Sequence, residues 1–115
     1  MNQSTIIIDV ALDQNKIPEQ ISWSAGGSTA EQAQKAKAVM VSFWDGNDKA
    51  ALRLDLWTKD MMVDEMTDFF YQTLMTMADT YSRATHREEL VGEMKSFAKQ
   101  FYKKSKELQE KENVK

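Results

Sequence analysis

The strongest constraint on the fold is a change in hydrophobic period near Asp60. Before it, a leucine occupies every second position from Leu52 to Leu56, which is the pattern of a half-buried β-strand. After it, apolar side chains recur every three or four positions as far as Tyr81, which indicates one long amphipathic helix. We expect Asp60 to cap this central helix, because a carboxylate can accept the free N–H groups of a first turn.

The start of the chain predicts a β-hairpin. Residues 5–12 alternate, and their run of three isoleucines strongly favours a strand. Residues 13–18 break the alternation and contain Asn and Pro, which both form turns. Residues 20–24 resume the alternation, with Ile21 and Trp23 on one side. We therefore predict two antiparallel strands joined by this turn.

A second hairpin is predicted around the Asp-Gly step at Asp45, because such a step between two alternating runs is a strong hairpin signal. A two-residue loop would place Val41 opposite Leu52, whereas a four-residue loop would place Phe43 there. Both registers gather on one face the side chains of Val39, Val41, Phe43, Leu52, Leu54 and Leu56. A competing interpretation continues a helix from Thr29 through Phe43.

Two capping-box spacings predict further helix starts. Ser28 and Glu31 have this spacing and precede a segment rich in Ala, Gln and Lys, so a short helix is expected over residues 30–37. Thr85 and Glu88 have the same spacing and predict a last helix. The apolar stripe of this last helix consists of Leu90, Met94, Phe97 and Phe101.

Together these elements predict an α+β fold in the order ββαββαα. We expect a four-stranded antiparallel sheet, made from the two hairpins, with helices packed on one face. A chain of 115 residues has room for one domain, which we place at residues 4–102. Residues 103–115 are mostly charged and are expected to be a fraying helix end or a disordered tail.

Composition argues against several classes of protein. The chain has no cysteine, so disulfides, thiolate metal sites and thiol nucleophiles are excluded. A net charge of −3 disfavours nucleic-acid binding, which relies on concentrated Lys and Arg. The N-terminus lacks the pattern of a secretory signal, and no apolar run approaches the roughly 20 residues that span a bilayer. We expect a cytoplasmic protein with no membrane insertion.

No group of side chains predicts a catalytic, cofactor or metal site. Asp60, Asp64 and Asp68 share a helix face, but carboxylates near a helix start are typical of dipole stabilisation, and no calcium-loop spacing is present. His86 is the single histidine, and a general base usually needs an orienting partner. We interpret it as an exposed residue at the start of the last helix.

One face of the predicted sheet indicates a protein-interaction surface. Opposite the leucines lie Met40, Trp44 and Trp57, where alternation would normally place polar residues. Exposed apolar patches mark partner surfaces, and Trp and Met are enriched in them. The partner is expected to be another protein or a second copy of this chain. A covering helix would remove this surface.

A second function class also stays open, in which a small metabolite or an ion occupies a pocket between the sheet and the helices. Its predicted rim consists of Trp57, Asp60, Tyr71 and Tyr81.

The chain also resembles the gliding-motility-associated GldC family of the Bacteroidetes over about residues 4–102. The matching segments include Ile6–Asp13, Phe43–Asp45, Leu52–Asp60, Met62–Met66, Tyr71–Leu74 and Met77–Tyr81. The resemblance implies a small soluble cytoplasmic protein linked to gliding motility, which helps gliding work efficiently and does not form the motor. We expect no enzymatic activity, because no catalytic group of side chains is found. The resemblance brings no catalytic residues to transfer, and the Lys-rich segment after Tyr102 departs from the family pattern.

Overall fold

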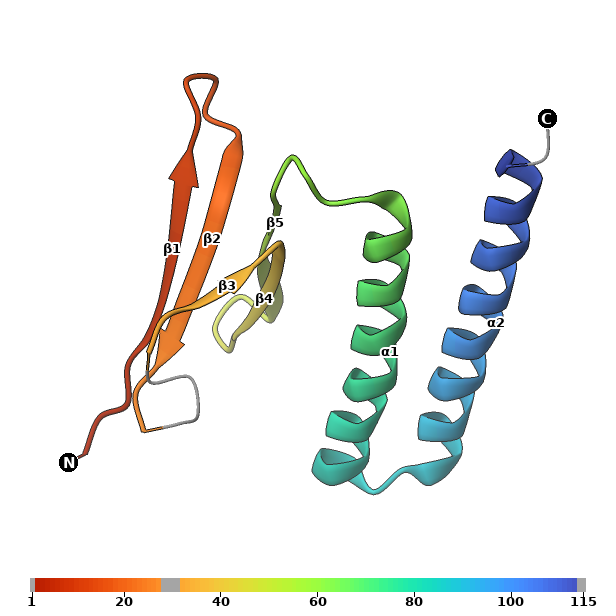
Figure 1. Ribbon diagram of the computed structural model, residues 1–115. Helices are drawn as coiled ribbons and strands as arrows, with labels where there is room; N and C mark the ends of the chain where they lie inside the picture. The colour runs from red at the N-terminus through yellow and green to blue at the C-terminus, as the bar shows by residue number, and fades with distance from the viewer. Residues whose placement is uncertain (1, 28–31, 114–115) are drawn as a thin grey trace. The chain divides into compact units, whose positions relative to one another are not determined.

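The computed structural model describes residues 2–27 and 32–113, which form two compact units (Figure 1). The β unit covers Met1–Met61 and the helical unit covers Met62–Lys115. The strands are β1 Ile6–Leu12, β2 Pro18–Ala25, β3 Gln34–Ala36, β4 Ala38–Asp45 and β5 Ala50–Trp57. The helices are α1 Val63–Thr85 and α2 Glu88–Asn113. The predicted α+β class is confirmed.

The first hairpin forms as predicted. β1 and β2 are antiparallel, with Val10 opposite Ile21. At the turn, one carboxylate oxygen of Asp13 accepts hydrogen bonds from the backbone N–H groups of Asn15 (2.8 Å) and Ile17 (3.0 Å). Lys16 adopts the left-handed region at φ 62° that the tight turn requires.

The helix expected over residues 30–37 is wrong where the structure describes it. Residues 34–36 form β3, which pairs with β2 and places Ala36 opposite Ile21. Ala, Gln and Lys are good helix formers, but intrinsic helix propensity is worth less than about 1 kcal/mol per residue, and the backbone hydrogen bonds offered by the open edge of β2 override it. The predicted cap at Ser28–Glu31 lies outside the described residues.

The second hairpin is confirmed, and its register is that of the four-residue loop. β4 and β5 are antiparallel with Phe43 opposite Leu52, which excludes the competing helix over the described part of that segment. The carboxylate of Asp45 accepts the N–H groups of Asn47 and Asp48 inside the loop.

The predicted four-stranded sheet is replaced by two smaller sheets, one of three strands and one of two. The division occurs at Lys37, the single residue between β3 and β4. On one side of Lys37 the chain pairs with β2, and on the other side it pairs with β5. A strand that bends in this way transfers the chain from one sheet to the next, as in orthogonal β packings.

The helical unit is an antiparallel hairpin (Figure 1). The buried side chains on its inner side are small, with both Ala78 and Ala98 fully buried, so the two helices approach closely. The rings of Tyr71 and Tyr102 lie 4.7 Å apart between centroids. Ion pairs join the helices along one side, between Lys95 and Asp79 at 2.7 Å and between Lys106 and Asp68 at 3.7 Å.

The helix ends differ from the predicted caps. Asp60 does not cap α1; Glu65 does so instead, since its carboxylate accepts the backbone N–H of Met62 at 3.1 Å. The predicted box at Thr85 also fails, because the Glu88 carboxylate accepts the Ser82 hydroxyl at 2.6 Å.

His86 ends α1 in the left-handed region and does not start α2, which corrects its predicted position. Its φ is 57°, and its N–H donates to the carbonyl of Ser82. α2 then continues to Asn113. Within the described part of the chain, neither helix is long and apolar enough to cross a membrane.

Candidate functional site

The two-stranded ribbon formed by β4 and β5 presents apolar side chains on both of its faces. We call the face that carries Met40, Trp44 and Trp57 the tryptophan face. We call the face that carries Phe43, Leu52 and Leu54 the leucine face. Strand alternation places these two sets on opposite sides of the ribbon.

The tryptophan face places its two indoles at opposite ends of the ribbon. Trp44 lies opposite Ala51 and is 69% exposed, while Trp57 lies opposite Ala38 and is 56% exposed. Because each cross-strand neighbour is an alanine, no large side chain of the partner strand covers the indole. Met40 is half-buried on the same face.

An ion pair occupies the space between the two indoles. The guanidinium of Arg53 donates to both carboxylate oxygens of Asp55, at 3.0 and 2.8 Å. The hydrogen bonds to this carboxylate raise the pKa of Arg53 above its ordinary value. Since the two charges neutralise each other, the tryptophan face combines two apolar anchors with an internally paired polar centre.

The alternation of Leu52, Leu54 and Leu56 predicted a half-buried strand, yet the side chains that define the leucine face are exposed in the structure. Phe43 is 63% exposed and Leu52 is 58% exposed. Sequence alternation identifies which residues share a face but does not state what covers that face. The sequence therefore predicted which side chains share this face, but it gave no sign that they would be exposed.

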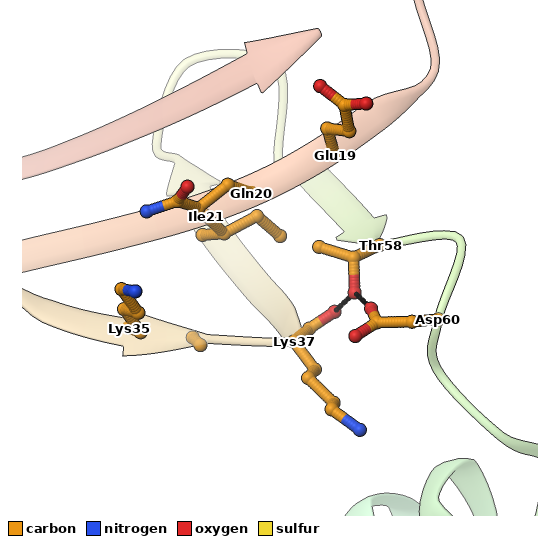
Figure 2. Close-up of a pocket in the computed structure, with 8 residues that line it drawn as sticks. Glu19, Gln20, Ile21, Lys35, Lys37, Thr58 and Asp60 are labelled. Carbon is orange, nitrogen blue, oxygen red and sulfur yellow. Dashed lines mark hydrogen bonds between the residues drawn. The ribbon is translucent and has the colours of Figure 1, made fainter. Parts of the chain in front are cut away.

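A buried threonine fastens the end of β5 (Figure 2). Thr58 is 2% exposed, and its backbone N–H donates to the carbonyl of Lys37 at 2.8 Å. Its hydroxyl lies 2.5 Å from the Asp60 carboxylate and 3.2 Å from the Lys37 carbonyl. The hydroxyl has one proton, and the shorter contact identifies Asp60 as the acceptor. This bond lowers the pKa of Asp60.

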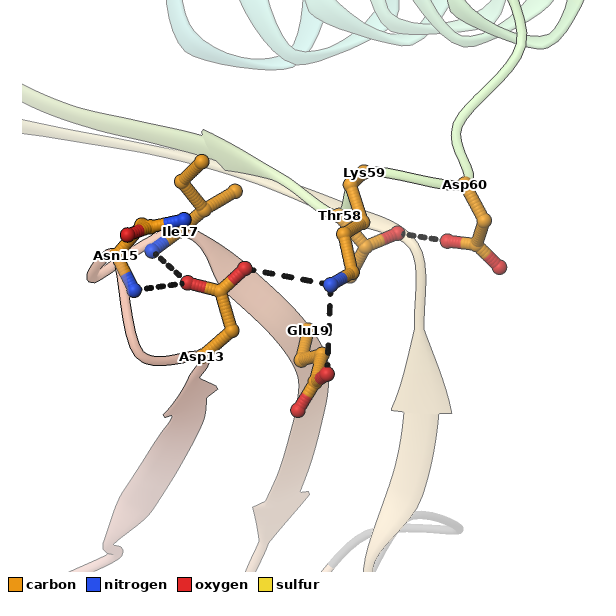
Figure 3. Close-up of polar contacts among 7 residues, drawn as sticks. All are labelled: Asp13, Asn15, Ile17, Glu19, Thr58, Lys59 and Asp60. Atoms are coloured by element: carbon orange, nitrogen blue, oxygen red, sulfur yellow. Dashed lines mark hydrogen bonds and ion pairs between the residues drawn. The ribbon is translucent and has the colours of Figure 1, made fainter.

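A lysine ties the first turn to the same place (Figure 3). The ammonium of Lys59 lies 3.2 Å from an Asp13 carboxylate oxygen and 3.4 Å from a Glu19 oxygen. Hydrogen bonds to these two carboxylates raise the pKa of Lys59. The pKa of Asp13 is lowered, first by the backbone N–H of Ile17. These contacts are structural, since each group is engaged by a neighbour.

A cavity of about 330 Å³ lies beside Thr58 within the β unit (Figure 2). It is lined by Glu19, Gln20, Ile21, Lys35, Ala36, Lys37, Thr58 and Asp60. Two lysines and two carboxylates give it mixed charge. A smaller apolar hollow of about 170 Å³ is lined by Ile6, Ile8, Ile21, Trp23, Ala36, Ala38 and Val39.

The remaining predicted site residues have ordinary partners. Asp68 pairs with Lys106, and Asp64 accepts the backbone N–H of Glu65. Tyr71 packs on Tyr102 within the helical unit. Across residues 2–27 and 32–113, no three His, Asp or Glu side chains are grouped so that they could hold a metal ion.

One comparison with known proteins gives a match. A protein-family model described as GldC-like: Gliding motility-associated protein GldC-like matches residues 18–107, more than three quarters of the chain. The matched range contains both hairpin strands of the ribbon and most of the two helices. No curated protein and no solved structure matches the chain.

Proposed function

The chain belongs to the GldC-like family, and we propose that it is a non-enzymatic cytoplasmic accessory protein of gliding motility that acts by binding another protein. The family description names a process and no reaction. The proposal assigns the binding to the tryptophan face of the ribbon.

The exposure of Trp44 and Trp57 carries this proposal. A side chain of this size that is 69% or 56% exposed leaves a large apolar area in water. Tryptophan is among the residue types that dominate binding energy at protein interfaces, usually within a ring of weaker contacts. The paired Arg53 and Asp55 suit such an interface, because neither charge needs a partner from the other protein.

The polar groups of the β unit support a binding role over a catalytic one. Thr58, Lys59 and Asp60 are engaged in bonds that join strands and turns. Their pKa shifts favour the charged forms, so Asp60 is held ionised and Lys59 protonated. A general acid or base needs the opposite tuning, toward the working pH.

The proposal is tested by paired variants of the full chain. Trp44→Ala with Trp57→Ala should weaken capture of a gliding component at least roughly tenfold and should fail to restore efficient gliding to cells that lack the protein. Phe43→Ser with Leu52→Ser tests the leucine face. Ile7→Ser, an exposed apolar position in another sheet, is the control.

Normal gliding and capture by a folded Trp44→Ala/Trp57→Ala variant would refute the tryptophan face. Loss only in the Phe43→Ser/Leu52→Ser variant would transfer the binding role to the leucine face.

A small-ligand function is the second candidate, favoured by the cavity of about 330 Å³ beside Thr58. Lys35 on β3, Lys37 directly after it, and the carboxylates of Glu19 and Asp60 in the same lining suit a zwitterionic metabolite. Such a ligand would raise the unfolding temperature, and above its Kd the stabilisation would grow with the logarithm of the ligand concentration. If no member of a panel of amino acids and other zwitterions changes the midpoint of thermal unfolding, this candidate function is refuted. Any increase in the midpoint that a ligand does cause should be abolished by Lys35→Glu.

A further inference from the structure

The helical unit has one charged side and one apolar side. Counting 3.6 residues per turn from the buried Ala78 and Ala98 places the ion-paired residues on one side of the hairpin. The same count places the large exposed apolar residues on the other side. These are Val63 (80% exposed), Phe70 (42%), Met77 (50%), Leu90 (41%), Phe97 (58%) and Leu108 (58%).

The middle of α1 has more apolar surface than its contact with α2 alone would require. Between Asp68 and Asp79, ten consecutive residues carry no charge. Seven of the ten are apolar or aromatic, which is more than a single apolar stripe requires and is typical of a helix covered on more than one side. α2 covers only the side marked by Ala78.

The apolar side of α2, on which Leu90, Phe97 and Leu108 are exposed and Phe101 is half-buried, reads nearly the same in both directions. If α2 of one copy lies antiparallel to α2 of a second copy, with residue 99 at the centre of the contact, Leu90 faces Leu108 and Phe97 faces Phe101. In the same register Glu93 faces Ser105, and Lys104, which faces Met94, is the next residue along, so an acidic and a basic side chain lie one position apart on each side of the apolar centre. Facing residues in an antiparallel helix pair have a constant sum of residue numbers, and the Leu90–Leu108 and Phe97–Phe101 pairs share the same sum.

The apolar side of α1 has its own centre of symmetry, between residues 73 and 74. Laid antiparallel on a second copy, Phe70 meets Met77 and Met66 meets Tyr81. This centre and the centre on α2 lie at the same level of the hairpin. The contact of Tyr71 with Tyr102 and the ion pair of Asp79 with Lys95 place residues 73–74 beside residues 99–100. A single twofold axis can therefore pass through the centre of the α1 contact and the centre of the α2 contact.

We propose that two copies of this chain associate through the apolar sides of their helical units, α2 antiparallel to α2 and α1 antiparallel to α1, as a four-helix assembly. A twofold interface uses the same patch on both subunits, which the two symmetric stripes provide. The six exposed side chains offer roughly 600 Å² per copy, against roughly 800 Å² per partner in a standard stable interface. This dimer is separate from the tryptophan face and stands without it.

A charge swap between copies tests the register. Glu93 and Lys104 are eleven positions apart on one helix and can meet only across two copies. In Glu93→Lys alone or Lys104→Glu alone, two like-charge pairs should weaken the dimer roughly tenfold at low salt. An equimolar mixture of the two variants should dimerise as tightly as wild type, because the mixed dimer restores both attractive pairs. The double variant Glu93→Lys/Lys104→Glu should also recover.

Sedimentation equilibrium of the full chain supplies the measurement, with far-UV circular dichroism to confirm folding. Glu89→Lys mixed with Lys103→Glu is the control, because these exposed positions lie off the stripe and give the same net charges. A mixture of the test variants that associates no better than each alone would overturn the proposed register. A wild-type chain that stays at 13.2 kDa up to millimolar concentration would overturn the dimer itself.

Discussion

The β unit and the helical unit hold themselves together in different ways. Among the described residues of the β unit, Ile21 is the large side chain that is fully buried, at 1% exposed, and the bonds of Thr58 and Lys59 join the strands and turns. The helical unit relies on small buried residues, Ala78 and Ala98, which let the helices approach. In both units the bulkiest apolar side chains lie outside this core.

The difference between the two exposed surfaces indicates different occupants. The apolar side of the helical unit is symmetric along both helices, which suits a second copy of the same chain. The tryptophan face of the ribbon carries two indoles around an internally neutralised Arg53–Asp55 pair, and we assign this face to a distinct protein. The following variants test this contrast between the units.

Ile21→Ala should have the largest effect on stability. Removing three buried carbons from the centre of the β unit should lower its free energy of unfolding by about 3 kcal/mol. All three tryptophans lie in the β unit, so urea unfolding followed by tryptophan fluorescence reports this loss. Ile7→Ala, at a position 49% exposed, should cost less than about 1 kcal/mol. Equal costs for the two variants would mean that Ile21 is not the core of this unit.

Ala98→Leu should have the next largest effect, and it acts on the helical unit. The added carbons have no room between the helices, so the free energy of unfolding should fall by about 2 kcal/mol. Helix unfolding is followed by circular dichroism at 222 nm. The same exchange at the exposed Ala84 should change stability little, and a neutral Ala98→Leu would show that the helices are not closely packed.

Thr58→Val should have a smaller effect, of about 1 kcal/mol, on the β unit. It keeps the side-chain shape and the backbone bond to Lys37 but removes the hydroxyl donor to Asp60. Thr76→Val provides the comparison, since that hydroxyl bonds only to carbonyls of its own helix. If both variants lower the free energy of unfolding by the same amount, the hydrogen bond from Thr58 to Asp60 makes no specific contribution to the stability of the β unit.

Asp13→Asn should show the smallest effect at neutral pH and a distinctive dependence on pH. Because folding lowers the pKa of Asp13, its ionised form stabilises the fold fully above the ordinary value of 3.8. This contribution is lost as the pH falls below 3.8 through the lowered pKa. Asparagine still accepts from Asn15 and Ile17 but carries no charge.

Urea midpoints of wild type and Asp13→Asn should therefore converge as the pH falls below 3.8. Lys59→Met should retain much of the wild-type pH dependence, since the N–H of Ile17 is the first cause of the shift. Parallel curves for wild type and Asp13→Asn would refute this role.

Local periodicity predicted most of the elements but not how they combine. The two hairpins and the central helix followed from alternation and from the three-to-four residue spacing. β3 was missed because its pairing with β2 is a tertiary interaction that intrinsic propensity does not encode. The division into two sheets at Lys37 was missed for the same reason.

The candidate site was predictable in its residues but not in its surroundings. Register alone placed Met40, Trp44 and Trp57 on one face of the ribbon, as the strand pairing has it. The polar bonds around Thr58 escaped prediction, because they join positions 21 and 46 residues apart. The sequence made Asp60 a reasonable helix cap, but in the structure its carboxylate accepts the hydrogen bond of the Thr58 hydroxyl instead.

The most direct test of the contrast is sedimentation equilibrium on two double variants beside wild type. We predict that Trp44→Ser/Trp57→Ser remains a dimer of twice 13.2 kDa, and that Phe97→Ser/Phe101→Ser becomes a folded monomer. A tryptophan variant that becomes monomeric, beside a phenylalanine variant that stays dimeric, would contradict it and assign self-association to the ribbon.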